Sequence, residues 1–175
     1  MKLKKMIYLA ILVSIGLALH IIEGFIPNPF VGLAPGAKLG LANIIGLITL
    51  VLLGLKSALT VNILRSFLGG LATGAVTSMF YSMAGALLST VAMWFMYRYF
   101  KRQFSLIGVS VFGALAHNVA QLLVAAVIIN NIRIFIYLPI LMFASIFTGI
   151  FIGMTSNLTL SKIKNSVTES LTKQL

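Results

Sequence analysis

The sequence predicts an all-α integral membrane protein, built as a bundle of six transmembrane helices with both termini on the cytoplasmic side. Three observations support this prediction. Of the 175 residues, 60% are hydrophobic and only 9% are charged, whereas about a quarter of a soluble domain is charged. The apolar residues gather in long runs that short polar segments separate. The 13 Lys and Arg residues outnumber the 2 acids and lie mostly in those segments, as in loops on the cytoplasmic face.

Each expected helix is an apolar run close to the roughly 20 residues that a helix needs to cross about 30 Å of hydrocarbon. The first run follows three lysines and could be taken for a signal peptide. No small-residue cleavage site ends it, so we interpret it as a retained helix. The second and third runs are shorter than the ideal, so we expect that they are tilted or that they do not both cross fully. The six runs are residues 6–22, 39–53, 57–73, 76–97, 106–129 and 134–157.

The basic residues predict the orientation, because Lys and Arg in short loops stay preferentially on the cytoplasmic side. With the N-terminus inside, six helices place ten bases on the inner side and only Lys38 and Arg133 on the outer side. Arg65 is left inside a helix. Five or seven helices would break this division. We expect a bacterial cytoplasmic membrane protein, with residues 1–158 forming one transmembrane domain and 159–175 a polar cytoplasmic tail.

The composition excludes several chemistries. The sequence has no Asp, so it offers no aspartate pair for Mg²⁺ and no Asp nucleophile. It has no Cys, which removes disulfides, thiol nucleophiles and thiolate metal sites. The net charge of +11 follows from membrane topology, because the bases lie between apolar runs and not on one solvated face. We expect no enzymatic activity, no cofactor, no metal and no nucleic-acid partner.

Polar side chains inside the apolar runs are the main indication of function. A charged side chain at mid-helix costs about 2.5 to 3.5 kcal/mol on insertion scales, so it normally faces the bundle interior or a cavity. Asn62 and Arg65 share one face of the third run. Arg65 is either a site for an anionic group such as a carboxylate or phosphate, or a structural side chain bonded to backbone carbonyls. In the fifth run, His117 and Gln121 lie one turn apart, beside Asn118.

The polar residues of the fifth run leave several interpretations open. His117 is a ligand contact, a proton-coupling group or an interhelical hydrogen bond. Asn118 and Gln121 either contact a ligand or join helices. Before the second run, residues 20–40 form a long connector that contains three of the four prolines. We expect this connector to fold back as a lid or binding loop, and a surface hairpin without a ligand role is the alternative.

Three stretches carry a resemblance to a known family: residues 35–43 (Pro-Gly-Ala-Lys-Leu-Gly-Leu-Ala-Asn), 65–70 (Arg-Ser-Phe-Leu-Gly-Gly) and 113–121 (Gly-Ala-Leu-Ala-His-Asn-Val-Ala-Gln). To about residue 157, the chain resembles the Gx transporters, proteins often labelled heptaprenyl diphosphate synthase component I. This family looks related to the S components of energy-coupling factor transporters, which are six-helix substrate-binding subunits. The missing Asp argues against the catalytic label, because prenyl diphosphate synthases hold substrate through Mg²⁺ on Asp-rich motifs.

The resemblance implies a membrane subunit that captures a small molecule in a pocket opening outward, beneath the loop after the first helix. We expect an anionic ligand that is vitamin-like or related to quinones or isoprenoids. Besides membrane lipid, the implied partner is a transmembrane coupling subunit joined to two ATPases. It would contact the small side chains of Ala10, Ser14 and Ala18, although the family pattern favours Ala at the position of Ser14. The expected substrate-binding residues are Lys38, Asn43, Asn62, Arg65, His117, Asn118 and Gln121.

Two other classes of function stay open. The first is a non-catalytic membrane anchor or assembly subunit of a redox or isoprenoid- and quinone-related complex, which would have a well-packed interior behind the proline-rich connector. The second is an ion or proton channel. A cation channel would need an intramembrane acid, and the sequence offers only Glu23 at the edge of a run.

Overall fold

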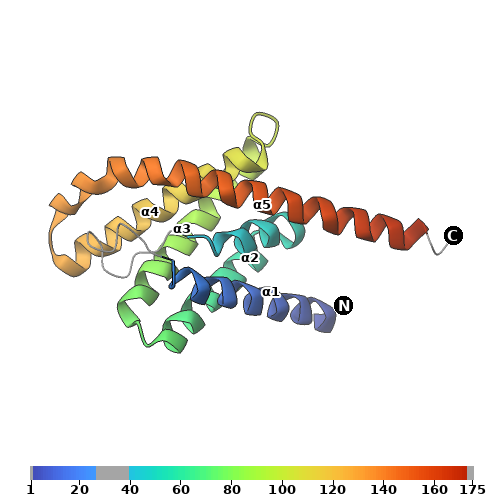
Figure 1. Cartoon of the computed structure of the whole chain (residues 1–175), viewed down its shortest axis with the longest axis horizontal. Coiled ribbons are helices and arrows are strands. Elements are labelled where there is room, and N and C mark those ends of the chain that lie inside the picture. Colours follow the sequence, from blue (N-terminus) through green and yellow to red (C-terminus); the bar gives the residue numbers. More distant parts are fainter. Residues whose placement is uncertain (1, 27–39, 173–175) are drawn as a thin grey trace.

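The computed structural model describes residues 2–26 and 40–172, and these residues are helical almost throughout. A 3₁₀ helix, η1 (Ile132–Tyr137), links the last two of five α-helices. Side chains are described from residue 3 to residue 164 of these ranges. The α-helices, shown in Figure 1, are α1 (Lys2–Glu23), α2 (Asn43–Thr73), α3 (Val76–Tyr99), α4 (Leu106–Ile129) and α5 (Leu138–Thr172).

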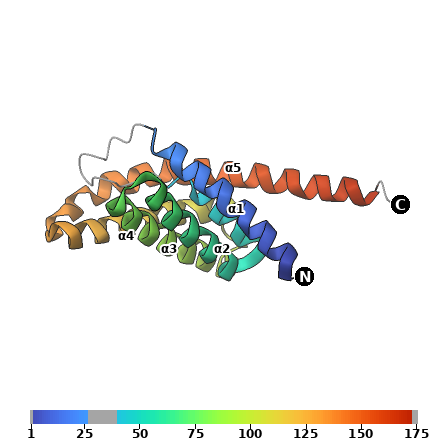
Figure 2. The same ribbon diagram turned by 90° about the horizontal axis from the view of Figure 1, so that it is seen from below.

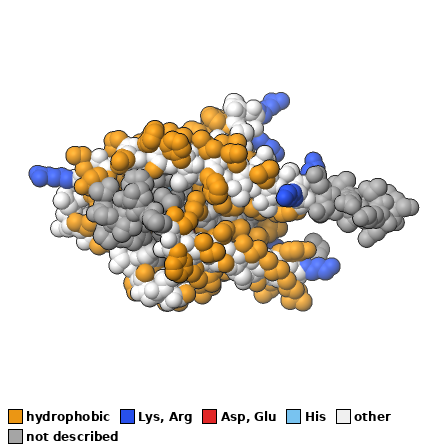
Figure 3. All heavy atoms as spheres, in the orientation of Figure 1, with side chains coloured by type: hydrophobic (Ala, Val, Ile, Leu, Met, Phe, Trp, Pro, Cys, Tyr) orange, Lys and Arg blue, Asp and Glu red, His pale blue; other side chains and the backbone are white. Residues whose placement is uncertain are grey.

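The five α-helices of the described chain are each long and apolar enough to cross a membrane. Their outer faces carry large apolar side chains, for instance Phe80 on α3 and Val127 on α4, which are 53% and 80% exposed. Hydrophobic side chains cover much of the face seen in Figure 3, and Lys and Arg appear at its edges. Such a surface is unfavourable in water and is matched by hydrocarbon. The chain is therefore a multi-pass helical membrane protein.

Within the described residues, the expected count of six spanning helices is corrected to five. The expected third helix and the described part of the second belong to one element, α2, which is interrupted at Gly54. Gly54 has φ +80° and ψ 177°, a backbone region that is essentially restricted to glycine. We call residues 43–53 the short arm of α2 and residues 55–73 its long arm. The short arm is about 16 Å long, too short to cross about 30 Å of hydrocarbon.

The two arms of α2 lie side by side and run in opposite directions. Arg65 on the long arm donates a hydrogen bond to Asn43, 22 residues earlier at the start of the short arm. A straight helix would separate these two residues by about 33 Å. A Cβ added to Gly46 on the short arm would also collide with the amide of Asn62 on the long arm. The chain therefore forms a helical hairpin at Gly54.

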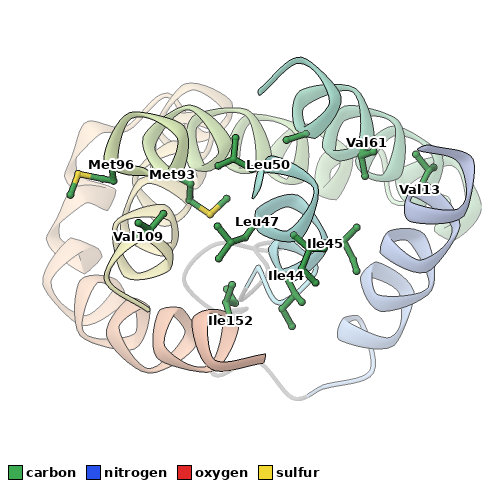
Figure 4. Packing of buried hydrophobic residues seen from close by; sticks show 12 residues of the cluster. Val13, Ile44, Ile45, Leu47, Leu50, Val61, Met93, Met96, Val109 and Ile152 are labelled. Atoms are coloured by element: carbon green, nitrogen blue, oxygen red, sulfur yellow. The ribbon is translucent and has the colours of Figure 1, made fainter. Parts of the chain in front are cut away.

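The short arm occupies the centre of the bundle. Every residue from 42 to 50 is buried, so protein surrounds this segment on all sides. Its side chains are accordingly apolar on nearly every face of the helix. Figure 4 shows Leu47 pointing toward Met93 and Val109, with Ile44 between α1 and α5. Ser156 of α5 donates a hydrogen bond of 3.5 Å to the Ile44 carbonyl. The other helices thus surround a segment that is only half as long as they are.

Except at the C-terminal end of α5, the remaining helix boundaries agree with the sequence predictions to within a few residues. α4 has the predicted bounds, and α1 and α3 exceed theirs slightly. α5 begins later than predicted because residues 132–137 form η1, and it continues as a helix through the region assigned to the tail. α4 and α5 approach closely where Ser110 donates a 2.6 Å hydrogen bond to the Gly149 carbonyl.

Both termini lie at one end of the molecule, where α5 extends past the other helices (Figures 1 and 2). Consecutive elements alternate in direction, so the Gly54 turn and the α3–α4 connection also belong to this end. The described Lys and Arg residues of these segments therefore lie at one end, and Arg133 of η1 lies at the other. Which side of the membrane each end faces stays a prediction.

Candidate functional site: a buried polar cluster at mid-depth

The short arm of α2 begins in the interior of the bundle, about halfway along its neighbours. Its first residue, Asn43, contacts His117, which lies midway along α4. Asn43 also accepts a hydrogen bond from Arg65, which lies against Gly16 of α1. The N-terminal end of a helix carries a partial positive charge from its unpaired backbone N–H groups. The start of the short arm therefore creates a positive potential at mid-depth in the bundle.

Glu23, the last residue of α1, supplies a negative group to this helix end. Its side chain is buried, and its carboxylate accepts hydrogen bonds from the backbone N–H groups of Gly40 and Ala42, the latter at 3.4 Å. Ala42 occupies the N-cap position and has no side-chain oxygen with which to cap the helix. Glu23 thus caps the short arm from another helix, which satisfies a carboxylate that would otherwise be costly to bury.

Arg65 joins the two arms of α2. Its Nε donates a hydrogen bond of 2.8 Å to Asn62 Oδ1, and its Nη2 donates one of 2.7 Å to Asn43 Oδ1. Both partners are neutral amides, and Arg65 is 2% exposed. Gly16 gives the side chain room, because a Cβ at that position would lie 2.9 Å from Arg65 Cδ. Arg65 is therefore a buried cation whose direct partners carry no charge.

His117 continues the hydrogen-bond chain toward α4. Its Nδ1 lies 3.2 Å from Asn43 Nδ2, and its Nε2 lies 2.7 Å from the side-chain amide of Gln121. Because Asn43 turns its oxygen toward Arg65, its nitrogen faces Nδ1 of the ring. The Gln121 atom nearest Nε2 is likewise an amide nitrogen, so an amide group lies at each ring nitrogen, and a neutral imidazole can accept a hydrogen bond from only one of them. The ring lies against Gly85 of α3.

The cluster extends to α3 through Asn62. Its Nδ2 donates a 2.6 Å hydrogen bond to Thr90 Oγ1, and Thr90 donates to the Ala86 carbonyl. Ser82 lies two turns earlier on the same face of α3, and its buried hydroxyl has no hydrogen-bond partner within the described chain. We call seven buried side chains the polar cluster: Glu23, Asn43, Asn62, Arg65, Thr90, His117 and Gln121.

The structure brings together five of the seven expected substrate-binding residues. Asn118 is not among them, because it points toward α5 and donates to the Leu141 carbonyl at 3.1 Å and to Ser145 Oγ at 2.7 Å. This is the interhelical hydrogen bonding that was its alternative interpretation. Lys38 lies outside the described residues, as does most of the proline-rich connector. The five that meet are Asn43, Asn62, Arg65, His117 and Gln121.

Sequence reasoning did not assign Glu23 or Thr90 to the cluster, and it also missed the buried His20. Glu23 could have been found, because a lone acid at the end of an apolar run needs a buried partner. His20 is 2% exposed and lies against Gly69 on the long arm of α2. Thr90 gave no signal in the sequence, since a threonine in an apolar helix usually bonds its own backbone.

The small residues of α1 lie on the opposite side of that helix from the bundle. Ala10, Ser14 and Ala18 are exposed, and the Ser14 hydroxyl donates a 3.0 Å hydrogen bond to the Ala10 carbonyl. The side of α1 that faces α2 carries Val13 and Gly16, which are buried. The surface expected to meet a partner is therefore not used in packing within the described chain.

The chemistry of the polar cluster is that of recognition by charge and hydrogen bonding. It contains one acid and one guanidinium group, and the other members are amides, a hydroxyl and an imidazole. The described residues contain no group of three or more His, Cys, Asp or Glu that would hold a metal ion. In a low-dielectric interior, a cation and a helix N-terminus favour a negatively charged group, and within the described chain the Glu23 carboxylate supplies one at the helix end.

The fold and the cluster define a polytopic helical membrane protein with a buried polar centre. The family described as heptaprenyl diphosphate synthase component I has a sequence model that matches residues 12–159. The chain belongs to this family, as its three motifs indicated. Searches of curated proteins and of solved structures found no match.

Proposed function

We propose that the chain is the ligand-binding membrane subunit of a transporter, comparable in role to S components, and that it captures a small anionic molecule. One observation carries the proposal: a half-length helix begins at mid-depth beside a buried Arg65. Half-helices whose N-termini point at anionic substrate groups are a recurring device in membrane transporters. The vitamin-like or quinone- and isoprenoid-related class of the ligand, and uptake as the direction, belong to the same proposal.

Two further features support an anion site. The carboxylate of Glu23 already accepts backbone N–H groups at this helix end, which marks it as a place where a negative group is stabilised. The Ser82 hydroxyl is buried without a partner, which is uncommon in native proteins and leaves a donor for a ligand. In this proposal the chain has no catalytic role and needs no cofactor.

The proposed partner is a transmembrane coupling subunit that joins two ATPases. The exposed line of Ala10, Ser14 and Ala18 supports it, because small side chains let another helix approach closely. The proposed orientation places both termini and most bases on the inner side of a bacterial cytoplasmic membrane.

A second function is favoured by a different observation. Asn43, Asn62, Arg65 and His117 satisfy one another by hydrogen bonds, as in a cluster that only holds helices together. Such a cluster suits a membrane anchor or assembly subunit of a redox or isoprenoid-related complex, with no ligand of its own.

The two functions are separated by what co-purifies with the protein. We expect native mass spectrometry of the protein in mild detergent to show a bound small anion, and Arg65→Gln to lower its occupancy at least about tenfold by removing one charge. Arg133→Gln, an exposed arginine of η1, is the matched control and should retain the ligand. Equal occupancy in a folded Arg65→Gln variant would contradict the assignment and favour the anchor. Should Arg65→Gln not fold, Gln121→Ala replaces it.

A further inference from the structure

A lateral groove separates α1 from α5. The short arm of α2 forms its floor, and its volume is about 530 Å³, within the range of roughly 300–1,000 Å³ that ligand sites occupy. Its lining is apolar except for two threonines of α5. Residues of the lining include Leu12, Ile15 and Leu19 on α1, Ile44 on the short arm, and Thr155 and Thr159 on α5.

The groove opens at the lipid-facing surface. Ile15 on one wall is 46% exposed and Phe151 on the other is 53% exposed, so both walls reach the outside of the bundle. The groove is distinct from the polar cluster, because Arg65 and His117 do not line it. It is also distinct from the line of small residues on α1, since Ser14 lies about 200° around the helix from Leu12.

One end of this apolar groove is basic. On α1, Lys5, Leu12 and Leu19 recur every seven residues, so the exposed Lys5 lies on the groove-lining stripe about 10 Å beyond Leu12. On α5, Lys162 is exposed and lies on the same side of the helix as Thr155 and Thr159. α1 begins and α5 ends at the same end of the molecule (Figure 1). Both walls therefore place a lysine at the same end of the groove.

We propose that the groove is a specific site for an anionic glycerophospholipid. One acyl chain lies along the apolar lining, and the phosphate lies between Lys5 and Lys162. An apolar trough with a cationic end matches a molecule with an apolar tail and an anionic head. The lipid fills the space between α1 and α5 and contacts both walls of the groove. This site goes beyond the proposed function and does not depend on it.

Native mass spectrometry tests the proposal on the full-length protein transferred from mixed phosphatidylglycerol and phosphatidylcholine nanodiscs into detergent. Wild type should retain one phosphatidylglycerol in preference to phosphatidylcholine. The double variant Lys5→Gln/Lys162→Gln should bind it about 30-fold more weakly, from the attraction that each lysine contributes near an anionic headgroup. The control is Lys101→Gln/Arg102→Gln, an exposed basic pair on the α3–α4 connection, which should leave retention unchanged.

A second variant distinguishes binding in the groove from attraction to the lysines alone. Thr155→Trp fills the trough and keeps both lysines, and we expect it to lose the retained lipid while the protein stays folded. An equal loss in the control pair would overturn the proposal, because it would show general attraction to basic loops. Retention of both lipids alike in wild type would also overturn it, and would point to bulk lipid or a partner helix in the groove.

Discussion

At the residue scale, glycine decides where polar side chains are buried. Four glycines lie where an added Cβ would come closer than 3 Å to the side chain of an Arg, an Asn or a His, so each provides room for one of these large polar groups. Close helix approach through small residues is usual in membranes, and here the space is used by polar groups. The pairs are Gly16 with Arg65, Gly46 with Asn62, Gly69 with His20 and Gly85 with His117.

Gly85→Ala tests this role. Its Cβ would lie 2.5 Å from Cε1 of the buried His117 ring. Hydrogen-bond contacts with Asn43 and Gln121 hold the two nitrogens of this ring in place. We expect a loss of about 1 to 3 kcal/mol in the free energy of unfolding, since the ring must shift. Gly108→Ala on α4 is the control, because its Cβ would meet only the half-exposed Phe104 ring at 2.9 Å. Thermal unfolding in detergent measures both, and equal losses would argue against the explanation.

The residues of the cluster were only partly predictable from the sequence. The spacing of Asn62 with Arg65 and of His117 with Gln121 placed each pair on one helix face, and each pair is in contact. Asn43 was identified only through a family motif. Periodicity is local, whereas the bond from Asn43 to His117 spans 74 residues of sequence. Such contacts depend on how helices are arranged, which one sequence does not show.

At the element scale, α2 is a hairpin whose reversal depends on one glycine. Gly54→Ala should cost about 1 to 3 kcal/mol, because the backbone there has φ +80° and ψ 177°. No atom lies within 4 Å of the added Cβ, so the cost is conformational and not steric. Gly74→Asn is the control: Gly74 has φ +65° and ψ 8°, a left-handed conformation that Asn tolerates.

Thermal unfolding of the two variants in the same detergent measures the loss of stability in each. A Gly54→Ala protein as stable as Gly74→Asn would mean that the reversal does not depend on this conformation. The sequence did indicate an irregularity here, because two short apolar runs met at residues 54–56. It did not indicate a short arm buried on all sides, because an apolar run has the same sequence pattern whether it faces lipid or protein.

At the scale of the whole molecule, the charges predict that one end of the bundle faces the cytoplasm. The sequence contains no cysteine, so single-cysteine variants can be labelled without background. Gln103→Cys on the α3–α4 connection and Ile132→Cys on η1 are both at exposed positions at opposite ends. In intact cells, a membrane-impermeant maleimide should label Ile132→Cys and spare Gln103→Cys. The opposite pattern would reverse the orientation.

The central position of the short arm has a consequence for biosynthesis. The arm is synthesised early, yet its Ile44 carbonyl bonds to Ser156, 112 residues later. Until α5 emerges from the ribosome, one side of the arm lacks its protein neighbour, and chains with such long-range contacts finish folding late. A premature stop near residue 138 would therefore damage the middle of the molecule and not merely its edge.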